Sequence, residues 1–83
     1  MTFIATFYTN YGAVKFFSYC INYLIQSRQM PVPRALSSSC GTCVRFDSVT
    51  WETVKNAEDL EACYIFNENA KEEPYVLVYR GDN

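Results

Sequence analysis

Two cysteines, Cys40 and Cys43, are the residues of this chain best suited to chemistry. They lie in the segment PVPRALSSSCGTCVRF, which runs from Pro31 to Phe46. The thiolate is the reactive form of cysteine, and nearby cations or backbone N–H groups that point at the sulfur favour it. A Cys-x-x-Cys spacing permits a disulfide, a mixed disulfide, or a persulfide that the second thiol resolves. The spacing therefore indicates thiol chemistry at these two positions.

Polar and basic residues surround the two cysteines. Arg34 and Arg45 are the local cations, and Gly41 allows the backbone to turn so that N–H groups can point at one sulfur. Three consecutive serines add hydroxyl and amide donors. We predict that these groups form a ligand-binding cradle around Cys40: Arg34, Ser37, Ser38, Ser39, Gly41 and Arg45.

The remaining composition excludes most other chemistry. The 83 residues include no histidine, which removes Cys-His dyads, Ser-His-Asp triads and His-containing metal sites. The three glycines are scattered, so there is no glycine-rich phosphate loop. Cys20 and Cys63 are expected to be buried structural thiols, and a zinc site using all four cysteines would need spacings unlike those of zinc knuckles. We expect no metal and no cofactor.

Charge is divided unevenly along the chain. Residues 1–46 carry four basic residues and no acidic one, whereas residues 47–83 carry nine acidic and three basic residues. Either the two halves complement each other in the fold, or the first half generates a positive field around Cys40 and Cys43. The few bases are scattered and the net charge is −2, which argues against nucleic acid as a partner.

Size and composition predict one small domain over residues 1–83. Hydrophobic residues make up 49% of the chain and aromatic residues 17%, which argues against disorder. No stretch approaches the roughly 18 apolar residues of a membrane span, and MTFIATF lacks the features of a signal peptide. Four cysteines without a secretion signal favour reduced thiols and a cytoplasmic location.

The elements that must position the cysteine segment follow from the hydrophobic pattern. In chain order, the predicted elements are strand 2–8, helix 11–27, strand 29–32, strand 43–46, a helix that begins at Asp47 or Ser48, strand 62–67 and strand 75–80. This order predicts an α+β fold: a two-layer, ferredoxin-like β-α-β-β-α-β sandwich with an extra C-terminal strand. The cysteine segment then forms a loop at one end of a mainly antiparallel sheet.

The predicted helix 11–27 has three faces. A narrow polar stripe is expected to face solvent and consists of Lys15, Ser18, Asn22 and Gln26. The opposite face is expected to enter the core and consists of Ala13, Phe17, Ile21 and Leu24. A third stripe is aromatic and consists of Phe16, Tyr19 and Tyr23. That stripe either packs against a neighbouring loop or forms a homodimer interface.

The cysteine segment also resembles the signature of the selenium/sulfur carrier-like proteins, a family of small bacterial domains. The resemblance extends back through FYTNYGAVKF and covers about residues 3–47. The residues in register are Pro31, Pro33, Arg34, Ser37, Ser38, Ser39, Cys40, Gly41, Arg45 and Phe46. The resemblance implies a carrier in which Cys40 holds sulfur or selenium as a persulfide or selenylsulfide. The family often has another small residue at the position of Cys43, so it implies less for that cysteine.

Taken together, these patterns predict a thiol-based carrier or redox adaptor rather than a self-sufficient enzyme. Its partners would be proteins that donate or accept sulfur or selenium. We expect neither nucleic acid nor a membrane among its partners. Two alternatives stay open. One is a non-catalytic interaction domain that dimerises through the aromatic stripe, with a cradle that binds a small anion or caps the sheet. The other is a dithiol oxidoreductase that cycles Cys40 and Cys43.

Overall fold

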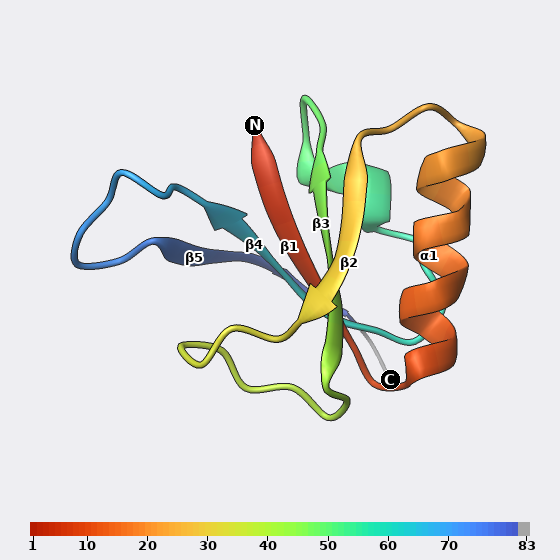
Figure 1. The fold of residues 1–83 in the computed structure, drawn as a ribbon, viewed down its shortest axis with the longest axis horizontal. Helices are drawn as coiled ribbons and strands as arrows, with labels where there is room; N and C mark the ends of the chain where they lie inside the picture. Colours follow the sequence, from red (N-terminus) through yellow and green to blue (C-terminus); the bar gives the residue numbers. More distant parts are fainter. Residues whose placement is uncertain (82–83) are drawn as a thin grey trace.

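The computed structural model describes residues 1–81 as a five-stranded antiparallel sheet with one α-helix, an α+β arrangement (Figure 1). The strands are β1 (Thr2–Phe7), β2 (Ser27–Pro31), β3 (Thr42–Asp47), β4 (Leu60–Phe66) and β5 (Tyr75–Arg80). Helix α1 spans Asn10–Asn22, and a single 3-10 turn, η1, spans Trp51–Val54. The strand order in the sheet is β2-β3-β1-β4-β5. No helix in residues 1–81 is long and apolar enough to cross a membrane.

Strand β1 is central and buried on both faces. Its side chains alternate, so that Phe3, Ala5 and Phe7 join the core under α1 while Ile4 and Thr6 are buried on the opposite face. The Thr6 hydroxyl donates to the Ala62 carbonyl at 3.4 Å, which satisfies the polar group in this buried position. The predicted first strand is therefore confirmed, and it fixes the positions of both neighbours.

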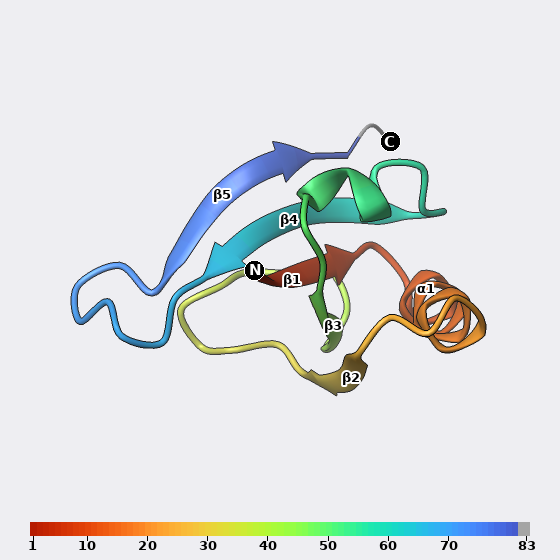
Figure 2. The same cartoon turned by 90° about the horizontal axis from the view of Figure 1, so that it is seen from above.

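The core between α1 and the sheet is largely aromatic. Phe46 stacks on Phe3 with 5.4 Å between ring centroids and meets Phe16 edge-on at 5.1 Å. Helix α1 contributes Ala13, Phe16 and Cys20 to this core. Figure 2 shows that the helix lies at one side of the molecule, whereas the link between β4 and β5 projects at the other.

The predicted core face of the helix is wrong at its C-terminal end. Ile21 is 56% exposed and Leu24 is 94% exposed. The helix ends at Asn22 because Leu24 adopts the left-handed conformation, with φ of 58°. The N–H of Ile25 donates to the Cys20 carbonyl at 2.8 Å and that of Leu24 to the Ile21 carbonyl at 3.2 Å. This pair of bonds is a Schellman cap, which normally has glycine at the left-handed position.

The predicted second helix is also wrong. Thr50 caps only the one turn of η1, with its hydroxyl accepting from the Glu52 N–H at 3.3 Å. Asp59 then adopts a positive φ of 60°, and its carbonyl accepts from the Tyr8 N–H at 2.8 Å. Residues 55–59 form turns that lead into β4, so the helical turn does not continue beyond Val54. Trp51 nevertheless stacks on Tyr79, with 4.5 Å between centroids, and closes that side of the core.

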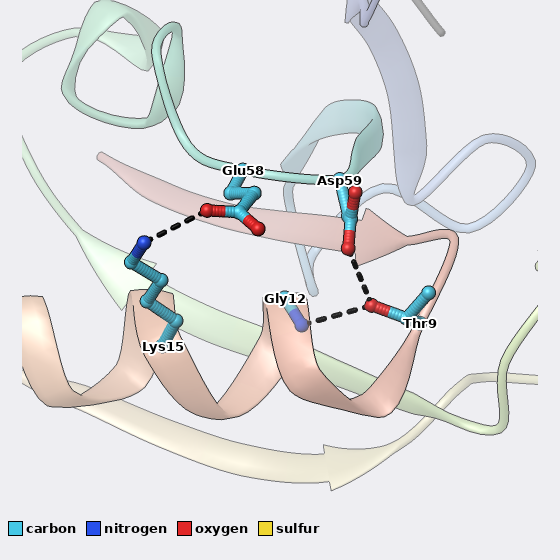
Figure 3. Close-up of polar contacts among 5 residues, drawn as sticks. All are labelled: Thr9, Gly12, Lys15, Glu58 and Asp59. Atoms are coloured by element: carbon cyan, nitrogen blue, oxygen red, sulfur yellow. Dashed lines mark hydrogen bonds and ion pairs between the residues drawn. The ribbon is translucent and has the colours of Figure 1, made fainter.

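The start of α1 is fastened to the turn that precedes β4 (Figure 3). The Thr9 hydroxyl accepts from the Gly12 N–H at 3.0 Å and donates to Asp59 Oδ2 at 2.7 Å. Lys15 Nζ and Glu58 Oε1 form an ion pair at 2.8 Å. Gly12 passes so close to this turn that an added Cβ would lie 2.7 Å from the Glu58 carbonyl oxygen.

We expect Gly12→Ala to lower the free energy of unfolding by about 1–3 kcal/mol, because the methyl group overlaps with backbone atoms of the turn. This loss outweighs the gain of about 1 kcal/mol that alanine brings to a helix. Urea unfolding followed by circular dichroism measures the change. The matched control is Gly41→Ala, where nothing lies within 4 Å of an added Cβ. Equal losses in the two variants would contradict this packing analysis.

Candidate functional site

The cysteine segment forms a ten-residue loop, 32–41, that joins β2 to β3. Its base is closed by the Val32 N–H, which donates to the Gly41 carbonyl at 3.1 Å. A turn near its middle is held by the Leu36 N–H and the Pro33 carbonyl at 3.0 Å. Figure 1 shows the loop at the bottom of the sheet, at the end where β1 stops and β4 begins. The predicted position of the loop at a sheet end is confirmed.

The serines of this loop hold a carboxylate of the chain itself. Glu61 Oε1 accepts from the Ser38 hydroxyl at 2.9 Å and from the Ser39 N–H at 3.1 Å. Glu61 Oε2 lies 3.3 Å from the Ser39 hydroxyl, which donates to it. The Ser38 hydroxyl is also 3.3 Å from the carbonyl of Phe7, at the end of β1. We call this set, Ser38, Ser39 and Glu61, the serine–glutamate clasp.

A bulge in β4 directs Glu61 into the clasp. In the pairing of β1 with β4, Thr6 faces Ala62 whereas the next residue, Phe7, faces Leu60. Glu61 is therefore the extra residue of a β-bulge, and bulges often change the direction of one side chain. Glu61 was not predicted from the sequence, because it lies 22 residues from Ser39 and has no motif of its own.

Cys40 and Cys43 have different surroundings. Cys40 is half-buried, and its thiol donates to the Thr42 carbonyl at 3.2 Å. Cys43 is fully buried, and its thiol lies 3.7 Å from the Pro31 carbonyl. Burial raises the pKa of Cys43 to about 11, and the negative charge that Cys40 can carry is a second, smaller cause of the rise. Near neutral pH, Cys43 is therefore held as an unreactive thiol.

Cys20 and Cys63 are buried, as predicted. Burial raises the pKa of Cys20 to about 11 and that of Cys63 to about 12. All four cysteines of the chain are free. Cys40 is consequently the one thiol of the four that solvent reaches in part.

The predicted cradle assembles only in its serine part. Arg34 is exposed at the turn of the loop. Arg45 lies on β3, two residues beyond Cys43, and its guanidinium lies 5.2 Å from the centre of the Phe66 ring. Gly41 does not have a positive φ, so glycine is not required there for the backbone turn. Ser37 is exposed, next to the clasp residues Ser38 and Ser39.

Two grooves of the surface lie away from Cys40. One groove of about 450 Å³ runs between α1 and the η1 region and includes Lys15, Tyr19 and Glu58. A second, of about 200 Å³, lies at the start of β2 and includes Arg28 and Arg45. Neither is lined by a residue of loop 32–41. Cys40 therefore lies at the base of a loop that lines neither of these grooves.

The predicted aromatic stripe is divided between core and surface. Phe16 is only 4% exposed and packs against Phe7 and Phe46, so it is not available to a second subunit. Tyr19 and Tyr23 are exposed and lie with 4.5 Å between their ring centroids. The expectation that all three rings form one interface is wrong for Phe16, because this ring points into the core.

One comparison with known proteins gave a match. The family model described as "Putative Se/S carrier protein-like" matches residues 2–61, which includes the whole cysteine loop and Glu61. The chain belongs to this family. The family resemblance seen in the sequence is thus confirmed, and the match reaches further than residue 47. Searches of curated proteins and of solved structures gave no match.

We expect iodoacetamide at limiting dose and pH 8 to label Cys40 before the other cysteines. At that pH a thiol with a pKa of about 11 is ionised to roughly one part in a thousand, and the thiols of this group are also buried. Peptide mapping by mass spectrometry measures the four rates. In denaturant the four rates should converge, which serves as the control. Labelling of Cys43 as fast as Cys40 in the folded protein would contradict the assignment.

We expect Glu61→Ala to release the loop, because its serine donors lose their acceptor. The free energy of unfolding should fall by about 1–3 kcal/mol, and the Ser39 amide should exchange its hydrogen faster. Nuclear magnetic resonance of the labelled chain measures both. The matched control is Glu58→Ala, which removes an exposed ion pair worth at most about 1 kcal/mol. If Ser39 exchange is unchanged in Glu61→Ala, the clasp does not hold the loop.

Proposed function

We propose that Cys40 carries a sulfur or selenium atom from a donor protein to an acceptor protein. Membership of the carrier-like family supports this role. The observation that carries the choice of Cys40 is its exposure: it is half-buried at the base of loop 32–41, whereas the other three cysteines are buried. A carrier must present its cargo to two partners in turn, and a thiol that solvent reaches in part suits that task.

Loading would be a thiol exchange in which no net oxidation occurs. The Cys40 thiolate attacks the terminal sulfur of a persulfide on the donor. A new bond forms between that sulfur and Cys40 Sγ while the donor's S–S bond breaks. The electron pair of the broken bond leaves with the donor sulfur as a thiolate, and the terminal atom keeps its proton. Selenium in the terminal position would follow the same steps and give a selenylsulfide.

Unloading reverses this exchange on another protein. A nucleophile of the acceptor attacks the terminal atom, and Cys40 leaves as a thiolate. Cys43 could interrupt this transfer if its thiolate attacked Cys40 Sγ. That attack would join the two cysteines in a disulfide and expel the terminal sulfur as hydrosulfide. The high pKa of Cys43, about 11, disfavours this attack. We therefore propose that Cys43 supports the loop and does not resolve the persulfide.

Transfer between two partner proteins is the task of a carrier or adaptor and not of a self-sufficient enzyme. We propose that the protein works in a compartment where thiols stay reduced, such as a cytoplasm.

We also propose that the fold is ferredoxin-like. The order of elements, β1-α1-β2-β3-η1-β4, supports this description if η1 occupies the place of the second helix. Strand β5 is then an addition at the edge beside β4.

We expect incubation with a cysteine desulfurase and cysteine to increase the intact mass of the protein by one sulfur atom. Cys40→Ser should remove this adduct entirely, because the accepting thiol is gone. Cys43→Ala should keep it, since the buried thiol takes no part in loading. Intact mass spectrometry of the three proteins, with circular dichroism as the folding control, measures the outcome.

Each other outcome points to a different function. Loss of the adduct in both variants would favour the dithiol oxidoreductase, because both thiols would then be needed. The absence of an adduct in any form, with slow and uniform alkylation of all four cysteines, would leave the interaction domain as the better account.

A further inference from the structure

We propose that the sheet face opposite α1 binds an acidic segment with apolar side chains on a partner protein. That this partner is the one that exchanges sulfur or selenium with Cys40 rests on the proposed function above. We call the surface the arginine face. Its members are Arg28, Arg45, Tyr64, Phe66, Tyr75 and Leu77.

Strand register places these residues on one face. Arg28 on β2 pairs with Arg45 on β3, and Arg45 pairs in turn with Ile4 on β1. On the other side of β1, Ile4 pairs with Tyr64 on β4, and Tyr64 pairs with Leu77 on β5. Residues paired in this way point to the same side of an antiparallel sheet. Phe66 and Tyr75 form the next pair on that side, two residues further along β4. The face opposes α1, because the α1 core uses the alternate residues Val44, Phe46 and Phe3.

The two arginines of the arginine face, Arg28 and Arg45, form no ion pair with a carboxylate of residues 1–81. Arg28 and Arg45 are directly opposed on neighbouring strands, an arrangement of like charges that costs stability. Within residues 1–81 the only ion pair joins Lys15 and Glu58, on the α1 side. Among residues 1–81, Asp47 is the one carboxylate that strand pairing places on this face; it lines a groove with both arginines, and its Oδ1 accepts from the Thr2 hydroxyl at 2.7 Å. Carboxylates from a partner would offset the repulsion between the arginines.

The distribution of basic residue types supports the same conclusion. All four arginines of the chain lie on this face or in the Cys40 loop: Arg28, Arg34, Arg45 and Arg80. The three lysines lie elsewhere, on α1, after η1 and in the link between β4 and β5. Arginine binds carboxylates through two parallel hydrogen bonds, so its concentration here favours recognition of acidic side chains.

Aromatic rings form the other half of the surface. The Arg45 guanidinium lies over Phe66, and Phe66 stacks on Tyr75 with 5.0 Å between centroids. Leu77 is 43% exposed beside them. Arginine, tyrosine and phenylalanine are the residues enriched in protein–protein interfaces. An occupant therefore needs apolar side chains as well as carboxylates.

The arginine face leads towards Cys40. On β3, Cys43 lies two residues from Arg45 in the direction of the loop and on the same face of the sheet. The distance between the two residues along the strand is about 7 Å. Cys43 lies opposite Met30, and the loop with Cys40 begins directly beyond. A segment docked on the arginine face would thus place the remainder of its protein beside the thiol. A second copy of this chain, docked through its own acidic residues, would instead cover that approach.

The probe is a synthetic twelve-residue peptide rich in Asp and Glu that contains two Leu and two Phe. It is titrated to millimolar concentration into the full chain carrying Cys40→Ser, with nuclear magnetic resonance as the readout. Because neither molecule undergoes sulfur transfer, the result does not depend on the proposed function. We expect shifts in the amides of β3, β4 and β5 on the arginine face, with affinity falling as salt is added.

Two arginine variants test the charge. Arg28→Gln alters an exposed residue, so the fold should be unaffected, and we expect the dissociation constant to rise about fivefold or more. Arg45→Gln should weaken binding at least as much, with circular dichroism as the folding control. Lys55→Gln removes the same unit of charge from the other side of the molecule, and we expect a change of less than about twofold. Leu77→Ser should weaken this peptide but not one that lacks Leu and Phe.

Several results would overturn the proposal. One is the absence of amide chemical-shift changes at millimolar peptide, and another is the restriction of these changes to the α1 side. A third is an equal rise of the dissociation constant in Lys55→Gln and in Arg28→Gln. Dimerisation of the free chain through the arginine face, seen by light scattering and lost in Arg28→Gln, would assign the surface to a second copy instead.

Discussion

The hydrogen bonds between Glu61 and the serines of loop 32–41 are the interaction on which the site depends. Without them, the ten-residue connection between β2 and β3 would be joined to the sheet only at its base, by Val32 and Gly41, and by the contact of Ser38 with the Phe7 carbonyl. The carboxylate joins the loop to β4, and the Ser38 hydroxyl joins it to the end of β1. Cys40 follows the clasp directly in sequence, so its position is set by two strands of the sheet. The arrangement combines partial exposure of the thiol with a defined location.

Burial separates the four cysteines into two classes. Three of them lie in apolar surroundings that raise the pKa of each thiol to about 11 or 12, which keeps them protonated and unreactive in the physiological range. Cys40 differs from them in exposure, because it is only half-buried at the base of the loop, where it packs against the edge of the core. A carrier needs this contrast, since a second reactive thiol beside the loaded one would release the cargo as hydrosulfide.

Much of the fold followed from local pattern, and the errors arose where distant contacts decide. The alternation in TFIATFY and CVRF predicted β1 and β3, and the apolar surroundings of Cys20 and Cys63 predicted their burial. The end of α1 could not be predicted, because Leu24 takes a conformation that usually requires glycine. The role of Glu61 was equally hidden, since it depends on a bulge in the pairing of β4 with β1. The three serines indicated a binding cradle, but they did not indicate that the carboxylate of Glu61 occupies it.

In the proposed function, Cys40 holds its cargo while the Cys43 thiol does not react. The most direct test is the lifetime of the persulfide on Cys40, followed by mass spectrometry after the donor has been removed. The proposed function predicts equal lifetimes, within about twofold, in the natural chain and in Cys43→Ala, because a thiol with a pKa of about 11 is ionised to only roughly one part in a thousand at pH 8. A much shorter lifetime in the natural chain, with a Cys40–Cys43 disulfide and hydrosulfide as products, would contradict it.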